Sequence, residues 1–352
     1  MKQFLNKKNN QLIGVDIGSR YVKAVLLSQK GKQYRLDAIA CEAIFGDVFQ
    51  EREIKDFDAV NHTLKKLRKS LNSNVKSVVL AISGSTVLTK TIDMEEGLSD
   101  VDLEAQIQVE ADSLIPYPIN EVYIDFEELR PSKRKKGRSD VLLSVAHKNI
   151  IENRTLLSRE AEYDVKVMDI EGYALGNAML QFGEFDPQEA AFCLNVGAAQ
   201  LQMTVVQNNQ VMMSRELPFG TDNLASEIAM SFGLNKGDVV KGLVSGDLPD
   251  NWKEMLYPQF LSSLHMQINR ILQLYATTFN TEPPKKIFLC GGAVHLPDLV
   301  EELAMDMHID VQIFDPLKGV EVGAGIDLTN FNGAQFAIAT GLAWRSFTSC
   351  HI

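Results

Sequence analysis

The chain has 352 residues, of which 45% are hydrophobic and 23% are charged, and its formal net charge is −11. This composition excludes a disordered or collagen-like chain, and the length allows two lobes of ordinary domain size. An acidic chain is also a poor candidate for wrapping nucleic acid. The sequence has no run of 18 apolar residues and no signal-type leader before Leu12, so we expect no membrane-spanning segment.

The cysteine content fits a protein of the reducing cytoplasm. The four cysteines, Cys41, Cys193, Cys290 and Cys350, show no metal-ligand spacing. Cys193 and Cys290 lie within apolar runs that we expect to be strands, which makes them small core residues. The sequence therefore predicts neither a metal cluster nor a disulfide framework at these positions.

The segment Ile13–Leu27 predicts a strand, a glycine turn that holds one aspartate, and a second strand. Glycine lets backbone N–H groups approach a polyphosphate, and Ser19 and Lys23 can add donors. Asp16, at the end of a buried strand, can hold a hydrated Mg²⁺. The same letters would also suit an ordinary tight hairpin in a core sheet.

Strands and helices alternate through the next part of the chain. Ser99 is the expected N-cap of an acidic helix that stops before Pro116. The remaining expected strands are 35–44, 77–82, 87–94, 122–129, 141–147 and 165–169, and the expected helices are 57–71, 150–163 and one that begins at Glu171.

A basic loop separates the expected strands 122–129 and 141–147. It could touch anionic lipid or nucleic acid, but a solvated hairpin tip is the favoured interpretation. Its cations are Arg130, Lys133, Arg134, Lys135, Lys136 and Arg138.

A second copy of the first hairpin appears at Ala191–Gln207. Asn195 stands in the place of Asp16 and Gly197 in the place of Gly18, an offset of 179 residues or about half the chain. Such an internal repeat predicts two similar lobes that each present a strand–turn–strand to a shared cleft.

A third glycine turn lies at Lys285–Leu299, where a buried strand ends in Gly291 and Gly292 and a helix start is expected. Between the second and third turns the sequence predicts a turn at 219–221, helices near Asp222 and after Asn235, and a long core helix over 258–279. The final segment, rich in glycine and alanine, is expected to pack closely on a sheet beside a hinge.

With its three glycine turns in this order, the chain resembles the actin-like ATPase superfamily. Within it, the sequence is similar to the PilM-type family of type IV pilus assembly proteins, which are relatives of FtsA. The similarity rests on LIGVDIGSRYVKAVLLS, on the block KTIDMEEGLSDVDLEAQIQVEADSLIPYPINEVYIDFEEL, and on VKVMDIEGYAL, SRELPFGTDNL and CGGAVHLPDL.

The resemblance implies an α/β fold: two lobes with duplicated βββαβα-type cores around a nucleotide cleft, and a small α+β extra subdomain. The implied division is 1–76 for the first-lobe core, 77–148 for the extra subdomain and partner groove, and 149–185 for the rest of the first lobe. The second lobe would cover 186–332, and a hinge helix 333–352.

The resemblance also implies ATP and Mg²⁺ as cofactors. The implied nucleotide contacts are Asp16, Gly18, Ser19, Arg20, Tyr21, Lys23, Asn195, Gly197, Ala198, Gly220, Asn223, Glu227, Lys241, Gly291, Gly292 and Ala293, with Asp16 reaching the metal through water. Glu171 would orient the water that attacks the γ-phosphate. An acid favoured at a helix N-terminus by the helix dipole would look the same.

One residue departs from the superfamily pattern. Asn195 replaces the aspartate usual in the second hairpin, and an amide gives no charge to Mg²⁺ and cannot act as a base. We therefore expect nucleotide binding with slow or negligible hydrolysis.

The family implies a cytoplasmic adaptor at the inner membrane, with the cytoplasmic tail of PilN in a groove that Leu114, Ile115 and Tyr117 would line. Self-association into a ring and contacts with other pilus inner-membrane and motor components are implied too, in pili that serve twitching motility, adhesion or competence. Two alternatives stay open, a sugar-type small-molecule kinase and a filament-forming protein like FtsA or MreB.

Overall fold

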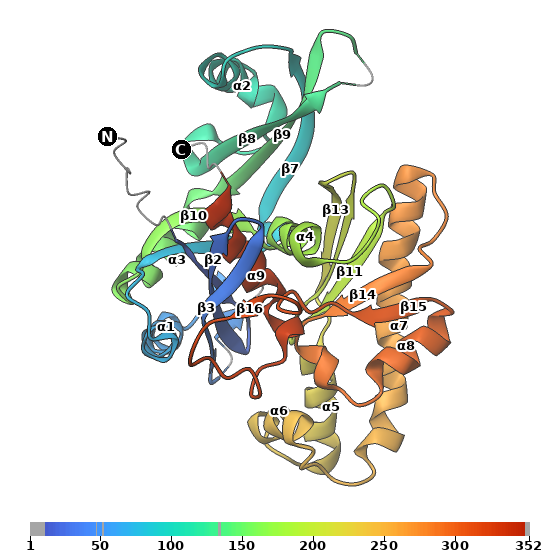
Figure 1. The fold of residues 1–352 in the computed structure, drawn as a ribbon. Coiled ribbons are helices and arrows are strands. Elements are labelled where there is room, and N and C mark those ends of the chain that lie inside the picture. Colours follow the sequence, from blue (N-terminus) through green and yellow to red (C-terminus); the bar gives the residue numbers. More distant parts are fainter. Residues whose placement is uncertain (1–10, 47, 51–52, 133–134, 349–352) are drawn as a thin grey trace. The chain divides into compact units, whose positions relative to one another are not determined.

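A computed structural model describes residues 11–46, 48–50, 53–132 and 135–348 (Figure 1). The chain divides into two compact units. The smaller unit is Ile82–Leu157, and the main unit contains the described residues on either side of it. The segment 77–148, expected to be an extra subdomain, overlaps the smaller unit.

Among the described residues, the main unit contains two large sheets and one short two-stranded ladder. The first has the strand order β10-β6-β1-β2-β3-β16, and the second has the order β13-β12-β11-β14-β15. The first-sheet bounds, in that order, are Asp164–Ile170, Ser77–Ile82, Ile13–Ile17, Tyr21–Lys30, Gln33–Ala43 and Glu321–Val322. The second-sheet bounds are Gln210–Leu217, Leu201–Gln207, Ala191–Val196, Lys286–Cys290 and Asp310–Ile313. A short separate ladder pairs β4 (Phe49–Gln50) with β5 (Glu53–Ile54).

The two sheets repeat one topology. β1 pairs antiparallel with β2 and parallel with β6, as β11 pairs antiparallel with β12 and parallel with β14. The order β3-β2-β1-β6-β10 thus corresponds strand for strand to β13-β12-β11-β14-β15. The half-length repeat predicted from the hairpins is confirmed. Every residue of β1 is buried, as expected for a central strand covered on both faces.

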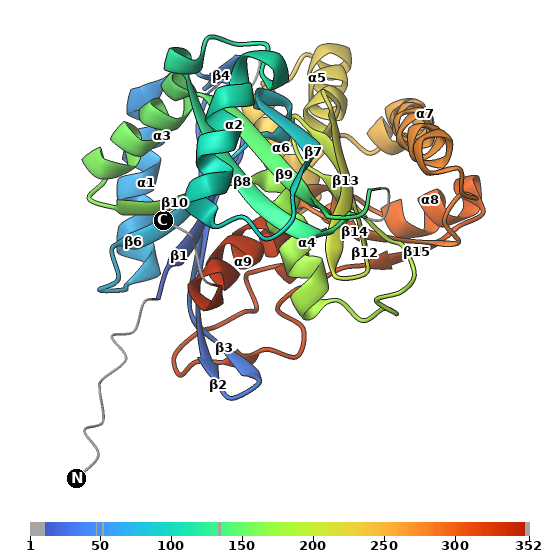
Figure 2. The ribbon, with the colours of Figure 1, turned by 90° about the horizontal axis from the view of Figure 1, so that it is seen from above.

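Helices cover these sheets (Figures 1 and 2). α1 is capped by Asp56, whose side chain accepts a hydrogen bond from the Ala59 backbone N–H at 2.9 Å. α3 (Lys148–Glu160) contains the boundary between the units. The other helices of the main unit are α1 (Phe57–Leu71), α4 (Glu171–Phe182), α5 (Thr221–Phe232), α6 (Lys236–Ser245), α7 (Trp252–Phe279), α8 (Leu299–Met307) and α9 (Ala337–Trp344).

Helices α4 and α9 lie against each other in both views of the ribbon, with α9 on β1 and β2 and α4 on β12 and β13 (Figures 1 and 2). A Cβ added at Gly341 of α9 would lie 1.8 Å from the Ala174 backbone oxygen of α4. One added at Gly14 of β1 would lie 2.1 Å from the Ala339 backbone oxygen. Glycine is required at both positions, so the small residues of the last helix serve close packing, as expected.

The second sheet and α5, α7 and α8 enclose a large apolar core. The predicted core face of the long helix is confirmed, since Phe260, Leu264, Ile268, Ile271, Leu272 and Tyr275 are all buried. Cys193 and Cys290 are buried free thiols on the adjacent strands β11 and β14, with their sulfur atoms 3.6 Å apart. Their predicted core role is confirmed.

The two largest differences from the predicted boundaries are both at helix starts. The long helix begins at Trp252 instead of Pro258, because the extra turns are anchored: the Trp252 and Tyr257 rings pack at 5.6 Å and the Tyr257 hydroxyl donates to the Pro297 carbonyl at 2.9 Å. The third glycine turn leads into a short 3₁₀ turn, Gly292–His295, and α8 starts only at Leu299. The proline at 297 holds Leu296 in an extended conformation, which delays the helix.

The smaller unit is built on a sheet with the order β7-β9-β8 (Val87–Glu95, Arg138–His147 and Val122–Pro131) and on α2 (Asp100–Leu114). Leu103, Ile107 and Ala111 of α2 join buried residues of β9 in its core. The predicted N-cap is confirmed, because the Ser99 hydroxyl oxygen accepts a hydrogen bond from the Asp102 backbone N–H. The helix ends before Pro116, as predicted.

The basic loop connects the antiparallel strands β8 and β9. The Lys135 ammonium lies 2.8 Å from the Asp93 carboxylate, and the Arg138 guanidinium donates to the Asp93 backbone oxygen at 2.6 Å. Lys136 is exposed, and Lys133 and Arg134 lie outside the described residues. Among the described helices, none is long and apolar enough to span a membrane.

Candidate functional site

The two predicted phosphate hairpins have the same geometry. The Gly18 N–H donates to the Tyr21 carbonyl at 3.1 Å, and the Gly197 N–H donates to the Gln200 carbonyl at 2.8 Å. Asp16 lies opposite Lys23 in the first hairpin, and Asn195 lies opposite Gln202 in the second. The constant offset of 179 residues therefore relates the turns, their hydrogen bonds and their side chains.

The first hairpin holds a buried ion pair. The Lys23 ammonium lies 2.5 Å from the Asp16 carboxylate, which is only 6% exposed. Burial acts to lower the pKa of Lys23, but Asp16, with contributions from Cys41 and Glu171, raises it above its usual value. Glu171, the first residue of α4, is thus close enough to influence Lys23 electrostatically.

Cys41 of β3 lies opposite Lys23, and Ser19 and Tyr21 belong to the same hairpin as the ion pair. Burial raises the pKa of the Cys41 thiol to about 11, against a smaller lowering effect of Lys23. Burial also raises the pKa of Tyr21, which Cys41 raises further. Ser19 lies in the turn between the strands, next to Gly18.

The second hairpin presents amides where the first presents charges. Gln202 is buried and its amide donates to the Glu216 carboxylate at 3.0 Å. Asn195 faces the third glycine turn, since a Cβ at Gly291 would lie 2.3 Å from the Asn195 Oδ1 atom. The structure therefore brings the second and third predicted turns together.

The third turn depends on its first glycine. Gly291 has φ 93°, a conformation that favours glycine, and its N–H donates to the Ala334 carbonyl at 3.0 Å. Gly292 is different, because a Cβ there would meet nothing within 4 Å. Ala293 is fully buried beneath the turn.

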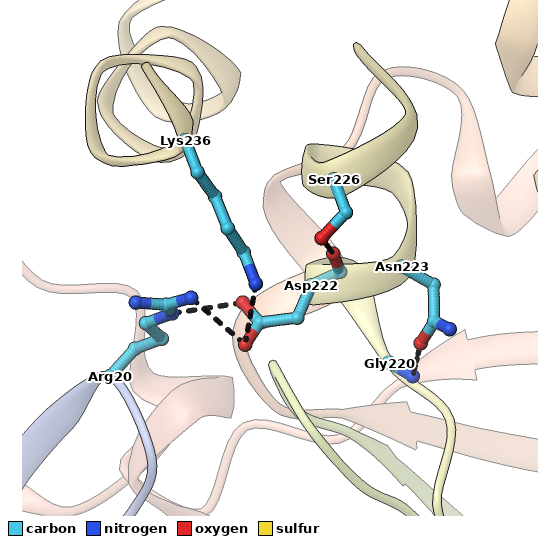
Figure 3. A network of polar contacts seen from close by, with 6 residues as sticks. All are labelled: Arg20, Gly220, Asp222, Asn223, Ser226 and Lys236. Atoms are coloured by element: carbon cyan, nitrogen blue, oxygen red, sulfur yellow. Dashed lines mark hydrogen bonds and ion pairs between the residues drawn. The ribbon is translucent and has the colours of Figure 1, made fainter. Parts of the chain in front are cut away.

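The N-terminus of α5 is bound to the second hairpin turn. The Thr221 and Asp222 N–H groups donate to the Gly197 and Ala198 carbonyls at 3.1 and 2.8 Å. A Cβ at Gly220 would lie 2.2 Å from the Ala198 oxygen, so only glycine fits there. The Asn223 side chain accepts a hydrogen bond from the Gly220 N–H at 3.1 Å (Figure 3).

Arg20 of the first hairpin turn reaches this same helix. Its Nε and Nη2 atoms donate to the two carboxylate oxygens of Asp222 at 2.9 and 3.0 Å, and the Lys236 ammonium lies 3.8 Å from the Asp222 Oδ2 atom (Figure 3). Sequence reasoning missed Asp222 and Lys236 as site residues. Asp222 marked only the expected start of a helix, and nothing local in the sequence points to a partner 202 residues away.

The first turn of α4 lies against the second sheet. A Cβ at Gly172 would be 2.1 Å from the Ser214 hydroxyl and 3.5 Å from the Gln202 amide nitrogen. The neighbouring Glu171 contributes to the raised pKa of Lys23 in the first hairpin. The beginning of α4 therefore approaches corresponding residues of both hairpins.

Two predicted contacts on α5 and α6 differ in environment. Glu227 has a buried carboxylate oxygen, Oε2, with no hydrogen-bond partner among the described residues. Lys241 is 71% exposed and pairs with Asp238 of its own helix at 3.7 Å. The lysine of α6 that contacts the site is Lys236.

The three residues predicted to line a partner groove belong to the smaller unit. Ile115 is only 5% exposed and belongs to its core, against which Leu114 packs. Tyr117 is 38% exposed, and its ring centroid lies 4.5 Å from that of His147. Tyr117 is thus the one of the three whose side chain is broadly accessible.

The comparisons with known proteins agree with this architecture. A family model for the type IV pilus assembly protein PilM matches residues 14–347. A solved PilM-PilN type IV pilus biogenesis complex is similar with a TM-score of 0.80 and 22% identity, over 96% of this chain and 99% of that chain. The ethanolamine utilization protein EutJ from Carboxydothermus hydrogenoformans is similar with a TM-score of 0.57 and 12% identity, over 94% of this chain and 88% of that one.

The structural similarities and the repeated sheets show the actin-like ATPase fold that the sequence predicted. The family match extends over nearly all of the described residues. The chain therefore belongs to the PilM family of type IV pilus assembly proteins, and its role lies in type IV pilus assembly.

Proposed function

We propose that this chain is a nucleotide-binding adaptor of the inner-membrane part of the pilus machinery. The main unit would bind ATP at its glycine turns, and the smaller unit would bind the cytoplasmic tail of PilN and so link the envelope components to the motor ATPases. The family match over residues 14–347 carries this proposal. The repeated hairpins and the similarity to a PilM-PilN complex support it.

The residues of the site fit a nucleotide. The turns at Gly18 and Gly197 would offer backbone N–H groups to phosphates, and the open space beside Gly292 would admit a flat base. The buried Oε2 atom of Glu227 lacks a partner among the described residues, and a ribose hydroxyl could donate to it. In this proposal Lys241, which is exposed, plays a smaller part than Lys236.

The site offers little to a metal ion. Among the described residues, no group of three or more His, Cys, Asp or Glu side chains could hold one. Asp16 would therefore be the protein's contribution to Mg²⁺, through water, with phosphate oxygens completing the coordination. Bound Mg²⁺ would neutralise phosphate charge.

We expect slow or negligible hydrolysis. Asn195 supplies no carboxylate, and Glu171, the candidate for orienting water, contributes to the raised pKa of Lys23. A steady-state rate below roughly 1 per second is expected, whereas typical enzymes reach 1 per second or more. A higher rate would contradict this part of the proposal.

A calorimetric titration with the cytoplasmic tail peptide of PilN tests the whole proposal. Binding should be measurable, and ATP should change its free energy by about 1–3 kcal/mol if nucleotide gates the peptide site. Asp16→Ala should weaken ATP binding and abolish the ATP effect on peptide affinity. An unchanged peptide affinity with and without ATP would remove the gating.

A pair of variants locates the peptide on the smaller unit. Tyr117→Ala should weaken peptide binding about tenfold if the ring lines the groove. Tyr123→Ala is the matched control, because Tyr123 is also exposed but hydrogen-bonds to Glu152 and lies beneath the Lys148 ammonium. Equal losses in the two variants would argue against a groove at Tyr117.

A further inference from the structure

The first hairpin turn contacts helix α5 through an ion pair that is absent from the corresponding position of the second hairpin. Arg20 forms a two-point ion pair with Asp222, and both side chains are mostly buried, at 14% and 22% exposure. Lys236, the first residue of α6, adds a second cation at 3.8 Å (Figure 3). One carboxylate thus faces two cations from separate parts of the chain.

This ion pair connects the two halves of the main unit. Arg20 lies in the turn between β1 and β2 of the first sheet. Asp222 is the second residue of α5, and its backbone N–H donates to the Ala198 carbonyl of the second hairpin turn. The repeat offers no second copy of the pair, because the position that corresponds to Arg20 is Ala199.

The guanidinium of Arg20 has the donor geometry that suits a phosphate. An Arg fork binds a carboxylate and a phosphate through the same pair of N–H groups, so the two anions exclude each other at that fork. A phosphate could use the Nε and Nη2 donors only after Asp222 has released them. The Asp222 carboxylate therefore occupies donors in the turn predicted to bind phosphate.

We propose that Asp222 is a latch that competes with the nucleotide's phosphates for Arg20. Without nucleotide, the carboxylate holds Arg20 and ties the first hairpin turn to α5. When nucleotide binds, its phosphate replaces the carboxylate on Arg20, and the tie is released. Asp222 is a positioning residue in this scheme, and the inference rests on the nucleotide binding proposed above.

The test is a double-mutant cycle on nucleotide affinity, read with a fluorescent N-methylanthraniloyl derivative of ATP. Asp222→Asn removes the competing charge and should tighten binding about fivefold, mainly through faster association. Arg20→Gln should weaken binding. In the Arg20→Gln background, Asp222→Asn should no longer tighten binding.

Asp58→Asn is the matched control. Asp58 is the second residue of α1, as Asp222 is of α5, and it is exposed. The substitution removes the same kind of favourable interaction with a helix dipole, but it does not remove an ion pair with Arg20. It should leave the affinity for the ATP derivative unchanged.

A second measurement does not depend on nucleotide. Amide hydrogen exchange of the protein alone should become faster over residues 17–22 and 220–226 in Asp222→Asn, and should stay unchanged there in Asp58→Asn. Unchanged exchange in both variants would overturn the latch.

The outcomes separate the latch from the proposed function. Two results would overturn the latch alone, provided that the wild type binds the ATP derivative. In the first, Asp222→Asn does not tighten binding. In the second, Asp222→Asn tightens binding equally with Arg20 and with the Arg20→Gln substitution. If neither the wild type nor any variant binds the ATP derivative, both the latch and nucleotide binding by this chain are wrong.

Discussion

The two hairpins of the main unit share one backbone and differ in their charges. In the first, a buried aspartate and lysine face each other, and in the second the corresponding residues are asparagine and glutamine. Hydrogen bonds and strand register are the same in both turns. The backbone conformation of such a turn therefore does not depend on the ion pair. The first hairpin can carry the buried charges while the second carries neutral amides.

This difference in charge suggests different roles for the two hairpins in ligand binding. The first hairpin has the carboxylate and the cations suited to phosphate and metal, and the second makes close backbone contacts with α5 and the third glycine turn. We infer that the first hairpin contributes charge to ligand binding and that the second contributes shape.

Asp16→Ala should be the most damaging change. It leaves the Lys23 ammonium buried without its partner, which costs about 3–5 kcal/mol of the free energy of unfolding. Asn195→Ala, the corresponding change in the second hairpin, should cost only about 1 kcal/mol. Urea unfolding followed by circular dichroism measures both.

The double variant Asp16→Ala/Lys23→Met tests whether the unpaired Lys23 ammonium causes the destabilisation. Because it removes that buried charge, it should recover most of the lost free energy of unfolding. Because the folded-state pKa of Lys23 is raised, the pair's contribution should be fully present below the usual lysine value of 10.5 and be lost only as pH rises beyond it. Equal losses for Asp16→Ala and Asn195→Ala would contradict the asymmetry.

Gly291→Ala should destabilise the second half strongly. The added Cβ needs a backbone conformation with φ 93° and would approach the Val196 backbone oxygen to 2.6 Å, so we expect a loss of about 2–4 kcal/mol. Gly292→Ala is the matched neighbour in open space and should change stability by less than about 1 kcal/mol. Thermal unfolding of the two variants tests whether the third glycine turn needs the close backbone approach at position 291.

Asn195→Asp tests whether charge can be restored to the second hairpin. With glutamine at position 202 there is no lysine opposite to neutralise it, so the variant should lose about 1–2 kcal/mol without nucleotide. With ATP and Mg²⁺ it should hydrolyse faster than the wild type. A phosphate-release assay measures the hydrolysis, and Asn195→Ala, which adds no carboxylate, should show no gain.

The smallest expected effect is on the reactivity of the Cys41 thiol, and it can be measured on the wild-type protein. Burial raises the pKa of its thiol to about 11 from the usual 9.0, so alkylation by iodoacetamide at pH 8 should be much slower than in urea-unfolded protein. The folded state favours the thiol form, so its contribution to stability is lost as pH rises from 9 towards 11. Equally fast labelling of folded and unfolded protein at pH 8 would show that Cys41 is not shielded.

Local sequence patterns predicted most of the elements and much of the site. α1 and β6 have the predicted bounds, and Ser99 and Pro116 delimit α2 as expected. These signals work because caps, prolines and apolar periodicity act within a few residues. The start of α7 could not be predicted in this way, since Pro258 reads as a helix start and the preceding turns depend on the contact between Tyr257 and Pro297.

The family, the repeat and the glycine turns follow from the amino-acid order, because the offset of 179 residues and the residues around each turn can be read directly from the chain. Which side chains meet depends on tertiary packing. Arg20 finds Asp222 across 202 residues, and Gly341 finds Ala174, only because packed sheets and helices bring them together. Such contacts depend on how whole elements pack, and no local pattern in the chain records them.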